Sequence, residues 1–386
     1  MALSISTNSF VGEFAKELVA DILLTGDTIA SGNISVHPNI KKAEKIQTIA
    51  TDAVFQARSD SFNASGTTTI SERSLTPVNL MSQDKVGINA LLATYQSTQM
   101  AAGANNNDLP NELGMFLIDR KAEIIRNQVD ELIWSGDTTL TGNAIRKWHD
   151  GIITLAEADS GVTKYDAGTG ALAPSSITVG ATTVLTFGSA VTTIYVGDKV
   201  KCKSFAGTDA ADLNDLTFNV LDVSGSTITI DAVTTGHTIT TNSGAARVRF
   251  INQSNVLTYF GNMLRVLPPA VVEAPDFRLY VPVHIADAYM DANIAAGLSG
   301  STSWEKNGQL VYKDKVIAKQ KYFPENTIMG SRVGNLWFGT DLVSDQNEVE
   351  AKYMKPITLD DEYRYSAKFS SCVNYGFASQ IKMVRA

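Results

Sequence analysis

The stretch YRYSAKFSSCVNYGF, residues 363–377, lies near the end of this chain of 386 residues. Aromatic, aliphatic and small residues hold every second position, and Arg364, Lys368 and Asn374 are among the residues between them. This strict period of two predicts a β-strand with one apolar face. At about fifteen residues, it is much longer than the roughly 5–6 residues of a typical strand. Such a strand needs an equally long partner to cover its apolar face.

A long helix between Asp108 and Ser135 is the natural partner. Asp108 can cap its N-terminus, and Pro110 fits the first turn, where a missing N–H costs little. Apolar residues then recur at helical spacing: Leu113, Phe116, Leu117, Ile124, Ile125, Leu132 and Ile133. The helix is predicted to stop at Ser135-Gly136-Asp137. At 1.5 Å per residue it would be almost 40 Å long, which suits a spine across an elongated domain.

Two N-terminal segments favour contacts with neighbouring molecules. Apolar residues recur every four positions at Phe10, Phe14, Leu18 and Ile22, which predicts an amphipathic helix that ends near Gly26. Residues 59–69 are small and polar and lie between strand-like flanks, which predicts a long β-hairpin with a flexible tip. Its flanks cannot form a core of their own. The hairpin is therefore either a surface loop or an arm that packs on another subunit.

The composition changes abruptly near residue 160. No glutamate occurs between Ala158 and Val272, and residues 161–250 lack Met and Trp but are rich in Thr, Gly, Val and Asp. Short alternating runs recur in this stretch, which predicts five or six strands in a small all-β barrel or sandwich. Because helical sequence lies on both sides, we expect this domain to be inserted into a host domain.

Composition excludes several classes of protein. Hydrophobic residues make up 44% of the chain, enough for a folded core. The net charge of −8 argues against a protein that grips nucleic acid by its phosphates. No stretch approaches the roughly 18 apolar residues of a membrane span, and no secretory signal is recognisable. Two cysteines, Cys202 and Cys372, form neither a metal site nor a disulfide scaffold, and we expect both to be buried.

No group of residues forms a catalytic motif. The phosphate-binding GxxxxGK[ST], the dinucleotide-binding GxGxxG and the GxSxG nucleophile elbow are all missing. Trp148-His149-Asp150 places a base beside a carboxylate, but adjacent residues rarely form an acid–base pair, so a structural role is expected. The sequence predicts a non-enzymatic chain with no catalytic residues, no metal ligands and no cofactor.

Two charged clusters have simple interpretations. Asp360-Asp361-Glu362 could hold a hard cation, but we expect a solvated turn before the long strand. The lysines Lys199, Lys201 and Lys203 share one strand face and could meet phosphate or an acidic surface. For them too we expect a solvated strand face.

Three stretches taken in order carry a family resemblance. They are the helix ending in Leu132–Asp137 followed by Trp148–Ile152; the strand-like Phe277–Val283 followed by the helical His284–Ala296; and Pro324–Ile328 with Asn335–Asp341 before the long strand with its Arg364 and Phe369. This order resembles the major capsid proteins of tailed bacteriophages, with the Hong Kong 97-type fold. The resemblance covers residues 1–158 and 251–386.

The resemblance implies an α+β fold with an N-terminal arm, an extended β-hairpin loop, a spine helix, and peripheral and axial domains. The implied segments are the arm 1–40, the extended loop 41–82, the peripheral domain with the spine helix 83–158, the inserted all-β domain 161–250, the mainly axial segment 251–345 and the C-terminal strands of both domains 346–386. The arm helix would contact neighbouring subunits through Phe10, Phe14, Leu18 and Ile22.

The function implied is that of a major capsid protein. Such a protein self-assembles as hexamers and pentamers into the icosahedral head shell that encloses the double-stranded DNA of a tailed phage. Its partners would be other copies of itself and candidate scaffold, portal and decoration proteins, with DNA enclosed without sequence-specific binding and no membrane. It would be a virion component assembled in the host cytoplasm.

Two departures from the family pattern lead to further expectations. No lysine lies between Lys45 and Lys85, so the extended loop cannot supply the lysine of an isopeptide crosslink. Only about 40 residues precede the loop, too few for a cleaved scaffolding segment, so any scaffold would be a separate protein. Two alternatives remain: an encapsulin-like nanocompartment shell, and a glycan-binding or glycan-processing enzyme, which would need a pair of carboxylates in a cleft.

Overall fold

The computed structural model describes residues 7–11, 23, 26–51, 55, 58, 60, 66–87, 111–142, 144–166, 171–241, 246–297, 305–306, 308–341, 348–360 and 362–385. Helices and strands are mixed along the chain, as the α+β prediction requires. The chain divides into two compact units. Unit 1 contains Met1–Leu155 and Gly334–Phe377, and unit 2 contains Ala156–Val333 and Ala378–Ala386.

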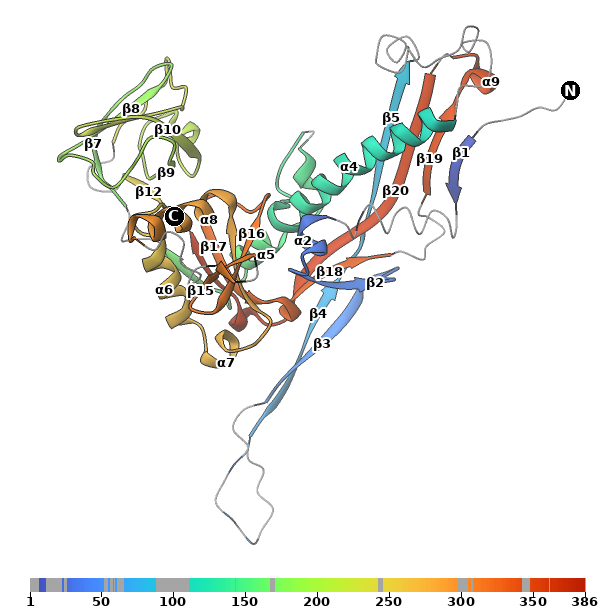
Figure 1. Ribbon diagram of the computed structural model, residues 1–386, viewed down its shortest axis with the longest axis horizontal. Helices are drawn as coiled ribbons and strands as arrows, with labels where there is room; N and C mark the ends of the chain where they lie inside the picture. Colours follow the sequence, from blue (N-terminus) through green and yellow to red (C-terminus); the bar gives the residue numbers. More distant parts are fainter. Residues whose placement is uncertain are drawn as a thin grey trace, which may run out of the picture. The chain divides into compact units, whose positions relative to one another are not determined.

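Unit 1 is built on a sheet around β20 (Glu362–Tyr375), the long strand that the period of two predicts. On one side, β20 pairs over ten residues with β5 (Val78–Gly87). On the other side it pairs first with β19 (Glu348–Tyr353) and then with β18 (Leu336–Thr340). All these pairs are antiparallel, and Figure 1 shows β20 as one long curved strand beside β5. Strand β18 therefore lies in unit 1, and the assignment of 251–345 to a mainly axial segment stays a prediction.

Helix α4 (Asn111–Ser135) confirms the predicted long helix and packs against β19 and β20. It ends at Ser135, at the predicted stop Ser135-Gly136-Asp137. A Cβ at Gly136 would lie 2.2 Å from the backbone oxygen of His149, so only glycine fits this close crossing of the chain. The other long partner of β20 is strand β5, which the sequence pattern did not reveal.

The N-terminal helix predicted from Phe10 to near Gly26 is wrong at Phe10, its first residue. Residues Thr7–Val11 form strand β1, antiparallel to β19, with Phe10 opposite Val349. Pairing with the edge of β19 satisfies the backbone N–H and C=O groups of this segment, and this tertiary contact outweighs the four-residue spacing. The other predicted interface residues lie outside the described residues: Phe14, Leu18 and Ile22. Farther along, α2 (Asp27–Ala30) and β2 (Ser35–Pro38) follow, and β2 pairs in parallel with β18.

The predicted hairpin is confirmed as a two-stranded ribbon. Strands β3 (Glu44–Thr51) and β4 (Thr68–Leu75) pair with each other in antiparallel register. The first strand, β3, lies wholly before the strand-like flank at 53–58 from which the hairpin is predicted. Most of that flank and of the tip at 59–69 lies outside the described residues. Figure 1 shows the ribbon leaving the rest of unit 1.

Unit 2 contains a seven-stranded sheet in the order β14-β15-β16-β13-β17-β21-β6. The strands are β14 (Glu305–Lys306), β15 (Gln309–Tyr312), β16 (Lys315–Gln320), β13 (Phe277–Pro282), β17 (Thr327–Arg332), β21 (Lys382–Arg385) and β6 (Thr163–Asp166). Helices α6 (Val256–Val266), α7 (Pro269–Val272) and α8 (Val283–Ala295) contribute to its core. The strand and helix predicted at Phe277–Val283 and His284–Ala296 are therefore present as β13 and α8.

A second sheet in unit 2 corresponds to the predicted all-β segment. It has six strands in the order β12-β9-β10-β11-β8-β7. They are β7 (Pro174–Thr178), β8 (Thr183–Phe187), β9 (Lys199–Lys203), β10 (Thr217–Ser224), β11 (Thr227–Ile230) and β12 (Arg247–Phe250). Strand β6, which lies inside the predicted segment 161–250, pairs with β21 in the other sheet. We call residues 171–250 the β module; its independence as an inserted domain stays a prediction.

Candidate subunit interface

The residues that the sequence analysis considered as candidate catalytic or metal-binding residues do not lie together in one site. Within the described ranges, no three His, Cys, Asp or Glu side chains are placed to hold a metal ion, and no helix is long and apolar enough to cross a membrane. His149 is buried, which lowers its pKa, and its Nε2 lies 3.1 Å from the hydroxyl of Ser371. The Asp150 carboxylate accepts hydrogen bonds from the backbone N–H and the hydroxyl of Thr138, both at 2.8 Å. These contacts fix the turn after α4, which is the structural role expected for Trp148-His149-Asp150.

The lysines of β9 do not form the solvated face that the sequence predicts. Lys199 forms an ion pair with Glu325. Lys201 is only 5% exposed, and its Nζ lies 3.8 Å from the Asp215 carboxylate. Burial, and then the nearby Arg385, lower the pKa of Lys201. The expectation of a solvated face is therefore wrong for Lys201, because β9 is partly covered inside unit 2.

The ribbon exposes an apolar pair. Ile49 and Ile70 lie directly opposite each other on β3 and β4, and each is 60% exposed. On the same face, four positions before Ile49, Lys45 pairs with Glu72 at 2.7 Å. A two-stranded ribbon is marginally stable in water, and pairing alone does not bury these side chains. This face is therefore suited to contact with another surface.

The base of the ribbon is fixed to β20. Leu75 is buried in a small core with Ile40 and Trp337. The amide of Asn374 donates a 2.8 Å hydrogen bond to the backbone oxygen of Ser74. One residue before Ser74, the guanidinium of Arg73 lies 4.5 Å from the centre of the Tyr375 ring. The ribbon is thus anchored at its base and exposed at Ile49 and Ile70.

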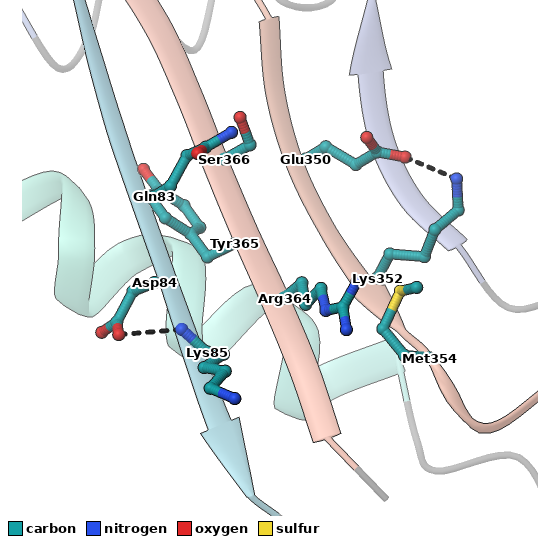
Figure 2. A pocket seen from close by; sticks show the side chains of 9 residues that line it. All are labelled: Gln83, Asp84, Lys85, Glu350, Lys352, Met354, Arg364, Tyr365 and Ser366. Atoms are coloured by element: carbon teal, nitrogen blue, oxygen red, sulfur yellow. Dashed lines mark hydrogen bonds and ion pairs between the residues drawn. The ribbon is translucent and has the colours of Figure 1, made fainter. Parts of the chain in front are cut away.

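A depression of about 620 Å³ lies on the sheet where β5, β20 and β19 run side by side (Figure 2). Three cations, Lys85, Arg364 and Lys352, stand directly opposite one another across these strands. Like charges in this position destabilise a sheet. Here Glu362 lies 2.6 Å from Arg364 and 3.5 Å from Lys85, and Glu350 lies 2.8 Å from Lys352. The depression is a surface of alternating charge.

Two side chains of the depression keep fixed protonation states at neutral pH. Burial raises the pKa of Tyr365 to about 12, so its hydroxyl stays protonated at neutral pH. The ion pair with Lys121 lowers the pKa of Asp84, which stays ionised. Neither group has the near-neutral pKa that suits a general base. The period of two placed Arg364 on the polar face, but the row of cations depends on strand register, which the sequence does not display.

The N-terminal segment is attached to α4 at α2. The indole N–H of Trp134 donates a 2.9 Å hydrogen bond to the hydroxyl of Thr28, and both side chains are buried. The buried carboxylate of Asp130 accepts hydrogen bonds from the backbone of Asp27 and Thr28, and burial raises its pKa to about 6. A Cβ at Gly26 would lie 2.8 Å from Asp130 Oδ1. These contacts hold the chain that leads into β2; the interface role of Phe10, Phe14, Leu18 and Ile22 stays a prediction.

Comparison with solved structures finds capsids. The chain is similar to one in the satellite phage P4 procapsid including size determination (Sid) protein, with 11% identity, a TM-score of 0.45 and coverage of 96% of this chain and 98% of that chain. It is similar to the capsid of a native GTA particle, with 10% identity, a TM-score of 0.48 and coverage of 94% and 92%. It is also similar to the capsid of Myoviridae phage XM1, with 9% identity, a TM-score of 0.46 and coverage of 93% of this chain and 91% of that chain.

No protein-family model and no curated protein matches the chain. The resemblance predicted from the sequence and this comparison both point to similarity with phage capsid structures. With identities of 9% to 11%, they carry no argument about function, which rests on the chain's own residues.

Proposed function

We propose that this chain is the major capsid protein of a tailed phage, which self-assembles as hexamers and pentamers into an icosahedral head shell around double-stranded DNA. The β3–β4 ribbon carries this proposal, because it is anchored at its base and exposes the Ile49–Ile70 pair. Removal of apolar surface from water stabilises a contact by about 25 cal/mol per Å². A neighbouring copy that covers the pair supplies the burial that the monomer lacks.

A shell needs several weak contacts on each subunit, because closed symmetry repeats every contact around the particle. The ribbon provides one such surface, and the charged depression on β5, β20 and β19 provides a second. In this proposal, unit 1 forms the peripheral domain, the seven-stranded sheet of unit 2 forms the axial domain, and the β module is the insertion.

The proposal includes partners and location. The net charge of −8 suits an inner wall that encloses DNA without binding it tightly. Scaffold, portal and decoration proteins are the expected partners besides other copies of the chain. The chain is proposed to be a virion component that is assembled in the host cytoplasm and to act without catalysis or a cofactor.

Electron microscopy and sedimentation of the purified full chain test this function together. Closed uniform particles, or rings of five and six subunits, are expected. A protein that stays a 41.5 kDa monomer at high concentration and with crowding agents would overturn the proposal. Nuclease-protected double-stranded DNA in particles purified from cells is expected for a phage shell, whereas protein cargo without DNA would favour the nanocompartment.

A further inference from the structure

The turn after α4 exposes apolar and basic side chains together. The turn contains η3 (Ile145–Lys147), which is followed by Trp148. The side chain of Ile145 is exposed, and that of Trp148 is 51% exposed. The ammonium of Lys147 lies 5.0 Å from the centre of the Trp148 ring, and the half-exposed Arg146 lies 3.5 Å from Glu131 of α4. The next residue, His149, is buried and hydrogen-bonded. Residues 145–148, here the basic patch, are thus presented on a fixed base.

The turn between β19 and β20 exposes apolar and acidic side chains. It contains α9 (Lys355–Thr358), in which Ile357 is exposed, and then Leu359, which is 86% exposed. The Asp360 carboxylate accepts a 2.9 Å hydrogen bond from the hydroxyl of Thr358 and lies 3.5 Å from the guanidinium of Arg364. Its side chain is still 57% exposed, so it remains accessible to a further cation. We call residues 357–360 the acidic turn.

Leu359 adopts an unusual backbone conformation. Its φ of 65° lies in the left-handed region, which is an outlier for a bulky residue and is normally left to Gly, Asn or Asp. Strain of this kind concentrates at functional positions. Here it coincides with a large apolar side chain held in water, which gains nothing within the monomer.

The basic patch and the acidic turn lie at opposite ends of β20. The acidic turn directly precedes this strand, whereas His149, next to the basic patch, contacts Ser371 near its other end. About nine residues of strand between them span roughly 30 Å. The two surfaces of one copy therefore do not meet, and any contact between them joins two copies.

We propose that the basic patch of one copy docks on the acidic turn of a second copy. Trp148 and Ile145 cover Leu359 and Ile357, and the cations beside Trp148 face Asp360. In this proposal each copy uses its basic patch on one neighbour and its acidic turn on another, so the contact is head-to-tail, the type that closes into rings. This inference rests on the proposed function, which supplies the second copy, and adds a contact that the ribbon does not make.

Mixed cysteine variants test the contact. Chains with Trp148→Cys and chains with Leu359→Cys are mixed under assembly conditions and mildly oxidised. The native Cys202 and Cys372 are buried, and burial raises the pKa of each thiol to about 12, so both stay unreactive. A crosslinked dimer is expected in the mixture and not with either variant alone. The matched control replaces Trp148→Cys by Ile124→Cys, another exposed apolar position of unit 1, and is expected to give no dimer.

The outcomes separate this contact from the proposed function. Closed shells without a crosslink in the mixture overturn the contact and leave the function standing. A chain that stays monomeric overturns both. A dimer of Leu359→Cys alone, or an equal yield with Ile124→Cys, overturns the head-to-tail pairing. Trp148→Ala is also expected to raise the concentration needed for assembly several-fold without lowering the unfolding temperature, and an unchanged assembly concentration would count against the contact.

Discussion

The β3–β4 ribbon and the β module are both built from antiparallel strands, but they differ in how far their apolar side chains are buried. In the module, Leu185, Val200 and Val248 are fully buried in a core that its own six strands supply. In the ribbon, Ile49 and Ile70 face solvent, because two strands leave no second layer to cover them. The difference predicts that the module folds by itself and that the ribbon needs a neighbour to cover its exposed pair.

Charging the exposed isoleucine pair should have the largest effect. The double variant Ile49→Asp with Ile70→Asp is expected to abolish assembly, because two carboxylates cannot be buried in a contact without partners. Thermal unfolding of the subunit should hardly change, since both side chains already face water. Sedimentation and differential scanning calorimetry of the same sample measure the two effects.

Val233→Asp is the matched control, because Val233 is an exposed apolar residue of the β module. It should assemble normally. If the ribbon variant still assembled, or if Val233→Asp failed equally, the contrast between the ribbon and the module would be lost.

A core substitution in the β module should have the next largest effect. Leu185→Ala is expected to cost about 2–5 kcal/mol in the unfolding free energy of the module, because it leaves a cavity among buried side chains. Hydrogen exchange should show lost protection in β8 and β11, which pair at this position. Val233→Ala should cause almost no change. Equal loss of protection in unit 1 would contradict the prediction that the module folds by itself.

The attachment of the N-terminal segment should depend on pH through Asp130. Its pKa is raised from 3.8 to about 6, so the folded state binds this proton more tightly than the unfolded state. Stability should therefore fall as the pH rises from about 4 to about 6, by about 1–3 kcal/mol, and then level off. Asp130→Asn should remove this part of the slope and be the more stable protein above pH 6.

Urea unfolding at several pH values measures this slope. The side-chain oxygen of asparagine can still accept the hydrogen bonds from the backbone of Asp27 and Thr28, so the variant tests the charge and not the contact. Parallel curves for the two proteins would show that Asp130 does not titrate in this range. The result also bears on the ribbon, since it tells whether the chain leading to its base is held equally firmly at all pH values.

Elements with a long and regular pattern could be predicted from the sequence. The alternation in β20 and the apolar stripe of α4 each extend over many residues, so local pattern and tertiary packing agree. The N-terminal segment behaves differently. Phe10 follows a helical spacing, yet it lies in β1, where its backbone pairs with the edge of β19.

The candidate interface was only partly visible in the sequence. The hairpin could be predicted, because polar turn residues separate two strand-like stretches. The exposed face of the hairpin could not be predicted, because the exposure of Ile49 and Ile70 depends on the number of strands in the sheet. The row of Lys85, Arg364 and Lys352 joins residues far apart in the chain, and only the strand register brings them together.

The smallest effect is expected from the ion pair on the ribbon itself. Lys45 and Glu72 lie on the same face as the isoleucine pair, and both side chains are exposed. Their hydrogen bond raises the pKa of Lys45 and lowers that of Glu72, but water and salt screen exposed pairs strongly. Lys45→Gln should therefore leave thermal unfolding unchanged and assembly nearly so at 0.15 M salt. A loss of assembly as large as that from Ile49→Asp would mean that charge, not apolar burial, fixes the ribbon to its neighbour.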